Sequence, residues 1–190
     1  MRTFGVSLLV AVAHLTAICP AKTLVADRSS AVSSRSQFCA NAPLTVAGTT
    51  FDRRNYGPYS RLEHRHNTKT ILWCAAESET YIILEMIAST AGSAVQALLD
   101  SAYSAIKMRL DNIGDGPVSS GLFRIGGGNN MELCTRNAHN HQQTWGVLGA
   151  AISALRDYMS NNGYGEASFN VFDGGTEVAA GTIGTRSNAP

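Results

Sequence analysis

The stretch from Thr144 to Met159, TWGVLGAAISALRDYM, constrains the fold of this 190-residue chain more than any other. Its large apolar side chains recur at steps of three and four, which places them along one face of a helix. They belong to Trp145, Leu148, Ile152, Leu155 and Met159. The hydroxyl of Thr144 is expected to accept a free backbone N–H of the first turn. A helix with such a stripe needs a partner surface, and its neighbours on both sides have the pattern of strands.

Two hairpins are predicted around that helix. Gly121 to Ile125 and Met131 to Arg136 flank a glycine-rich turn, and both alternate as strands do. Ala167 to Phe172 and Glu177 to Ile183 flank a second turn, Asp173-Gly174-Gly175-Thr176. The helix therefore connects the two hairpins.

Earlier in the chain the pattern predicts one strand and one long helix. Thr68 to Ala76 is predicted as a strand. Helical spacing then starts at Ser78 or Thr80 and continues to Leu110, with the alternative that Tyr81 to Leu84 begins as strand.

The predicted order of elements is strand, helix, hairpin, helix, hairpin. Its β-α-β-β-α-β core is the split-βαβ, ferredoxin-like arrangement, an antiparallel sheet with two helices on one face. The extra C-terminal strand is expected to extend the sheet at an edge. We therefore predict an α+β domain at residues 67–184 and a flexible tail at 185–190.

The N-terminus has the features of a secretory signal peptide. Arg2 is followed by an apolar run from Phe4 to Ile18 and by small residues up to Ala21, after which cleavage is predicted, with Ala26 as a second choice. No other apolar segment is long enough to cross a bilayer, so the product is expected to be soluble and extracellular. Residues 22–66 are predicted as an irregular N-terminal arm or pro-segment with short β pieces, fastened through Cys39 over the open face of the sheet.

Charge argues against two classes of partner. Removal of residues 1–21 takes only Arg2 from the 15 basic residues and none of the 14 acidic ones, so the mature net charge is zero. A neutral surface exerts no long-range attraction on nucleic acid or on an anionic membrane. Neither is expected as a partner.

Three cysteines remain after cleavage: Cys39, Cys74 and Cys134. Export through an oxidising compartment predicts one disulfide, and all three pairings are compatible with the sequence. The remaining cysteine is then either buried or available for intermolecular pairing.

Two His-x-His pairs are the candidate metal ligands. The first pair is His64 and His66, and the second pair is His139 and His141. Alternate residues of an extended segment point the same way, so each pair is able to place two imidazoles on one zinc or copper ion. Such a site would make the chain a small secreted metal-dependent enzyme. No Cys, Asp or Glu follows at a tight third-ligand spacing, which favours solvated loop histidines, and we expect no cofactor.

A segment that interleaves arginine with tyrosine is the candidate binding loop. Tyr and Arg are over-represented at the energetic centres of protein interfaces. Nucleic acid also stacks on such side chains, but the predicted strand Met131 to Arg136 lacks the paired aromatic residues of RNA-recognition sheets. The candidate binding residues are Arg53, Arg54, Tyr56, Tyr59 and Arg61.

The segments Thr144 to Ala151, Asp157 to Met159 and Phe169 to Val178 together resemble small secreted proteins of filamentous ascomycete fungi, many of which are treated as effector candidates. The resemblance covers roughly a third of the mature chain, and it carries no catalytic residue. It implies a secreted protein of effector type.

These observations predict a secreted, non-enzymatic protein that binds a host extracellular protein, with inhibition of a protease as the sharper version. One alternative is the metal-dependent enzyme that uses the two His-x-His pairs. Another is a self-associating surface protein, which a neutral charge and open sheet edges favour.

Overall fold

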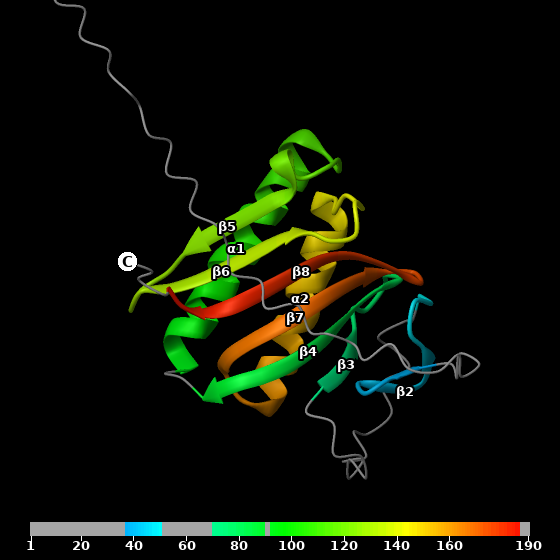
Figure 1. Cartoon of the computed structure of the whole chain (residues 1–190), viewed down its shortest axis with the longest axis horizontal. Coiled ribbons are helices and arrows are strands. Elements are labelled where there is room, and N and C mark those ends of the chain that lie inside the picture. The colour runs from blue at the N-terminus through cyan, green and yellow to red at the C-terminus, as the bar shows by residue number, and fades with distance from the viewer. Residues whose placement is uncertain (1–36, 51–69, 90–91, 187–190) are drawn as a thin grey trace, which may run out of the picture.

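In the computed structural model the placement of residues 37–50, 70–89 and 92–186 is described. The strands and helices lie in two layers, with both helices covering one face of a twisted sheet (Figure 1). The elements are β1 (Phe38–Cys39), β2 (Ala42–Val46), β3 (Thr70–Cys74), β4 (Thr80–Ser89), α1 (Gly92–Ile113), the single turn η2 (Ser119–Gly121), β5 (Leu122–Gly126), β6 (Met131–Asn137), α2 (Trp145–Asn162), β7 (Gly165–Asp173) and β8 (Thr176–Thr185).

The main sheet has six strands in the order β3-β4-β7-β8-β6-β5, and every neighbouring pair is antiparallel. The predicted α+β class, with two helices and an antiparallel sheet, is confirmed. The strand order does not confirm the ferredoxin-like core. The expected edge position of the last strand is wrong, because β8 lies between β7 and β6. The short turn of the β7–β8 hairpin holds β8 beside β7, and the other side of β7 is already paired with β4.

The predicted helix that starts at Ser78 or Thr80 is wrong in its first part, and the alternative that Tyr81 to Leu84 begins as strand is confirmed. Residues 80–89 form β4, and α1 begins only at Gly92. Ile82 pairs with Trp73 of β3 on one side and with Val171 of β7 on the other, and it is fully buried. The aromatic and β-branched run at Tyr81–Ile83 suits a strand with neighbours on both sides, and that pairing overrides the helical spacing.

The main core lies between the helices and the sheet. Along α2 the predicted stripe is confirmed, since Leu148, Ile152, Leu155 and Met159 are fully buried. The predicted cap is also confirmed, because Thr144 Oγ1 accepts a hydrogen bond from the Val147 backbone N at 3.3 Å. Burial of each such side chain contributes about 1.5–3 kcal/mol relative to exposure.

A second, smaller cluster covers one end of the opposite face of the sheet. Side chains alternate along a strand, so Cys74, Tyr81 and Phe172 point away from the helices. The rings of Tyr81 and Phe172 stack at 4.8 Å, and Ala42 of the β1–β2 hairpin packs into the same cluster.

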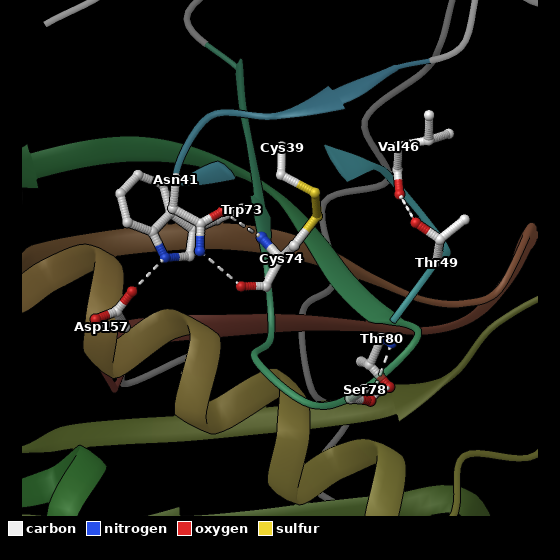
Figure 2. The surroundings of a disulfide bond; sticks show 9 residues. All are labelled: Cys39, Asn41, Val46, Thr49, Trp73, Cys74, Ser78, Thr80 and Asp157. Carbon is white, nitrogen blue, oxygen red and sulfur yellow. Dashed lines mark hydrogen bonds between the residues drawn. A yellow bond between two sulfur atoms is a disulfide. The ribbon is translucent and has the colours of Figure 1, made fainter. Parts of the chain in front are cut away.

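A disulfide fixes this hairpin to the sheet, as Figure 2 shows. Of the three pairings left open by the sequence, the structure forms Cys39–Cys74. Cys134 on β6 is buried and is not a free thiol. The Asn41 side chain donates to the Cys74 carbonyl at 2.8 Å and accepts from the Cys74 backbone N at 3.0 Å. The β1–β2 hairpin is therefore tied to β3 both covalently and by hydrogen bonds.

Candidate functional site

The predicted binding loop lies outside the described residues. Arg53, Arg54, Tyr56, Tyr59 and Arg61 therefore remain candidates from the sequence. The described residues on both sides of this segment are held firmly. Before the segment, Cys39 and Asn41 bond the β1–β2 hairpin to Cys74. After the segment, Cys74 is the last residue of β3.

The first of the two predicted histidine pairs, His64 and His66, also lies outside the described residues. These two imidazoles therefore remain candidate ligands from the sequence alone. The second pair, His139 and His141, is described, and it decides how far the predicted metal site is supported.

His139 and His141 lie in the turn after β6, and neither belongs to a strand. His139 has a positive φ angle of 50°, a conformation that occurs mainly in tight turns, and the His141 backbone N donates to the Ala138 carbonyl at 2.9 Å. The prediction placed both imidazoles on one side of an extended segment. That geometry is wrong for this pair, because the chain turns between the two residues instead of continuing as a strand.

The contacts of this pair are those of surface histidines. His139 Nε2 is 3.3 Å from Glu177 Oε2, its side chain is 70% exposed, and His141 is exposed as well. Across residues 37–50, 70–89 and 92–186, no three His, Cys, Asp or Glu residues gather as metal ligands. The described half of the predicted metal site thus consists of one exposed histidine in contact with Glu177 and one further exposed histidine.

A groove between the two helices brings together polar residues that the sequence pattern did not single out. Its volume is about 320 Å³. The helices are antiparallel neighbours, because Tyr164 after the end of α2 lies beside Gly92 at the start of α1, and Ile106 near the end of α1 lies beside Gly149. The groove is lined by Gln96, Leu99 and Asp100 of α1, by Ser153, Arg156, Asp157 and Ser160 of α2, and by Tyr164.

Arg156 is held on two sides within this groove. Its Nη2 forms an ion pair with Asp100 Oδ1 across the two helices. The guanidinium carbon lies 4.7 Å from the centre of the Tyr103 ring. The Arg156 and Asp100 side chains are 37% and 47% exposed, so both are fixed and yet open to solvent.

Asp157 is positioned from the sheet below. Trp73 of β3 donates from Nε1 to Asp157 Oδ2 at 2.9 Å, as the dashed line in Figure 2 shows. Trp73 is buried and packs edge-on against Tyr158 at 5.2 Å. The indole therefore sets the position of the carboxylate on the helix face, because the buried ring has little freedom to move.

Two tyrosines outside the groove lining have pKa values that burial shifts. Burial raises the pKa of Tyr158 above its ordinary value of 10.0. Burial also raises the pKa of Tyr81, and the negative charge of Glu177 adds a smaller effect in the same direction. Both phenols thus favour the neutral form more strongly than an exposed tyrosine does.

The start of α2 shows polar contacts between segments that are distant in the sequence. Asp115 Oδ1 accepts from the Gly146 backbone N at 2.8 Å, and Asp115 Oδ2 accepts from Thr144 Oγ1 at 3.2 Å. A carboxylate is favourable there because the first turn of a helix has free N–H groups and a positive dipole end. This contact stabilises the start of α2.

Chemically, the groove is suited to binding a polar ligand. It combines acceptor carboxylates, a donor guanidinium, an amide and hydroxyls that both donate and accept. In the sequence, the groove is indicated by a polar stripe along α2 at steps of three and four. The stripe is formed by Ser153, Arg156, Asp157 and Ser160.

Comparisons with protein-family models, with curated proteins and with solved structures found no match to this chain. In the described part of the chain, neither helix is long and apolar enough to cross a membrane.

Proposed function

We propose that the protein is exported and acts without catalysis, by binding an extracellular protein of a host organism. The observation that carries this proposal is the Cys39–Cys74 disulfide. Disulfides form and persist in oxidising compartments, which supports the export suggested by the signal-like N-terminus. The resemblance to small secreted fungal proteins supports the effector type.

The position of the disulfide supports binding through the Arg- and Tyr-rich segment. The two cysteines are 35 positions apart in sequence, and residues 51–69 lie between them. A backbone hydrogen bond from Ala40 N to Leu72 O, 2.9 Å long, ties the same two flanks together. Fixed flanks reduce the conformational entropy that a segment loses on binding. The more specific form of the proposal is inhibition of a host protease, since a segment between fixed flanks suits insertion into a cleft.

A pull-down from host extracellular fluid tests this proposal. The bait is the secreted protein, and the comparison is the triple variant Arg53→Ala, Tyr56→Ala, Arg61→Ala. Captured proteins are identified by mass spectrometry, and protease activity is profiled in the same fluid. We expect the wild type to capture a defined host protein, and we expect the triple variant to capture at least about tenfold less of it.

A control variant on α1 makes the outcome decisive. Ser104→Ala, Lys107→Ala and Asp111→Ala change three exposed residues outside the groove lining and outside the candidate segment. This control is expected to capture the partner as the wild type does. Equal capture by all three proteins, or capture of nothing, contradicts the proposal. Recovery of the chain from the cytosol with residues 1–21 still attached contradicts the export step.

A further inference from the structure

The lining of the α1–α2 groove contains charges of both signs. Asp100 and Asp157 contribute two carboxylates, and Arg156 contributes a guanidinium. An anionic ligand would therefore approach two carboxylates, and a cationic ligand would approach a guanidinium. Like charges at such short range are unfavourable, especially where the helices exclude part of the solvent. A neutral ligand avoids both penalties.

The same lining requires a ligand that both donates and accepts hydrogen bonds. The carboxylates only accept, the guanidinium only donates, and the Gln96 amide and the Ser153 and Ser160 hydroxyls do both. A polyhydroxylated ring presents adjacent hydroxyl groups, each of which is a donor and an acceptor. Such a ligand is able to satisfy all three kinds of group without adding charge.

The groove is also partly built before a ligand arrives. Arg156 is held by Asp100 and by the Tyr103 ring, and its guanidinium has five N–H donors, of which the ion pair uses one end. Asp157 is held by Trp73 from below. Side chains that are already fixed lose little entropy when they bind, which favours recognition of even a small polar ligand.

The volume of the groove limits the size of the ligand, and Tyr164 provides an apolar surface for it. Tyr164 follows the end of α2, where its ring atom Cδ2 would lie 3.5 Å from a Cβ atom placed on Gly92 of α1. An aromatic ring in the groove lining offers an apolar face to the C–H groups of a sugar ring. A volume of about 320 Å³ is at the lower end of known ligand sites, which run from about 300 to 1,000 Å³.

From these four observations we propose that the α1–α2 groove is a binding site for a neutral sugar of one or two rings. Arg156 and Asp157 bind its hydroxyl groups, and Tyr164 packs against the ring. The site is separate from the proposed host-protein contact, because none of its residues lies between residues 50 and 70.

Titrations of the full secreted protein, followed by two-dimensional NMR of backbone amides, test the site. The neutral probes are the methyl glycosides of glucose, galactose and mannose and their β-linked disaccharides. Glucosamine and glucuronate carry a positive and a negative charge on the same ring. We expect at least one neutral probe to shift the resonances of Gln96, Ser153 and Tyr164 in a saturable way, with an affinity in about the millimolar range. We expect glucosamine and glucuronate to bind more weakly.

Three variants separate binding from folding. Arg156→Gln and Tyr164→Leu are each expected to weaken binding of the neutral probe by about tenfold. Asp157→Asn keeps an oxygen that accepts the hydrogen bond from Trp73. This variant is expected to retain the fold and to bind the sugar more weakly. Asp111→Asn removes the same charge from an exposed position on α1 and is expected to bind as the wild type does.

The inference is overturned if no neutral glycoside shifts groove resonances in a saturable way. It is also overturned if glucosamine or glucuronate binds more tightly than every neutral probe, which would define a charged-ligand site. Equal binding by Asp111→Asn and Arg156→Gln, with both variants folded, would place the sugar elsewhere on the protein. A captured host protein with no sugar binding would leave the proposed function standing and reject this site alone.

Discussion

Gly181 of β8 shows how a single residue permits the close packing of the main core. A Cβ atom at this position would lie 2.5 Å from Phe169 Cζ and 2.9 Å from Thr135 Cγ2. Phe169 and Thr135 are both fully buried, on the strands that flank β8. The large ring of one neighbour occupies the space that a side chain on β8 would need, so only glycine fits between β7 and β6 here.

Gly181→Ala is accordingly expected to lower the free energy of unfolding by about 1–3 kcal/mol, because the added methyl group must displace the Phe169 ring. Chemical denaturation of the purified variant measures the change. Gly175→Ala, in the β7–β8 turn, is the matched control, since a Cβ atom there meets no other atom within 4 Å. Equal stability of the two variants would contradict the packing argument.

Tyr81 and Tyr158 predict a loss of stability at alkaline pH. In the folded protein burial raises both pKa values above 10.0, while the unfolded phenols titrate near that value. From about pH 10 upward the unfolded chain releases these protons and the folded chain retains them, so the free energy of unfolding falls as pH rises. Each phenol contributes up to about 1.4 kcal/mol per pH unit within this window.

The double variant Tyr81→Phe, Tyr158→Phe measures this contribution. Denaturant titrations between about pH 8 and 12 are expected to give a shallower decline for the variant than for the wild type. Below about pH 10 the two proteins should have parallel pH profiles. A wild-type profile that rises above that pH, or identical slopes for both proteins, would contradict the assignment.

At the scale of elements, local signals predicted the helix α2 and both hairpins, because their periodicity, capping residue and turn glycines lie within a few positions of one another. The start of α1 was predicted wrongly, since the apolar residues of β4 also fit helical spacing and only its pairing with β3 and β7 selects the strand. Asp115 and Asp157 were not recognised, because their partners Gly146 and Trp73 are 31 and 84 positions away in the sequence.

The disulfide is predicted to stabilise the attachment of the β1–β2 hairpin to β3 more than the packing of the main core. Cys39 and Cys74 belong to the small cluster beneath the β1–β2 hairpin, and neither belongs to the core between helices and sheet. Cys39→Ser with Cys74→Ser removes a cross-link between residues 35 positions apart, so the free energy of unfolding should fall by about 3–4 kcal/mol.

Denaturation followed by circular dichroism checks this prediction, and hydrogen exchange locates the change. Amides of β1, β2 and β3 are expected to lose more protection in the double variant than those of β7 and β8, whose protection falls only with the global free energy of unfolding. Uniform loss of protection across all strands would show instead that the disulfide holds the whole fold together.

At the scale of the whole molecule, the position of β8 decides how the fold is assembled. The strand β8 lies between β7 on one side and β6 on the other (Figure 1). Its Ile183 pairs with both Ala167 and Leu133. These three residues are fully buried against the helices. No local pattern reveals this, because an alternating strand fits an edge or an interior position equally well, and the choice depends on pairings far apart in sequence.

A chain that ends at Gly175 therefore tests the architecture. Without β8 the sheet would be divided into β3-β4-β7 and β6-β5, and β7 and β6 would each become an exposed edge strand. The apolar faces of α1 and α2 would lose part of the sheet that covers them. We expect this truncated protein to lack a cooperative thermal transition and to bind a hydrophobic dye. A chain that ends at Arg186 keeps all of β8 and its backbone bond from Arg186 N to Asn130 O, so it should unfold as the full chain does. A cooperative transition in the Gly175 truncation would mean that β6 and β7 are able to pair without β8, and the interior strand would then be dispensable.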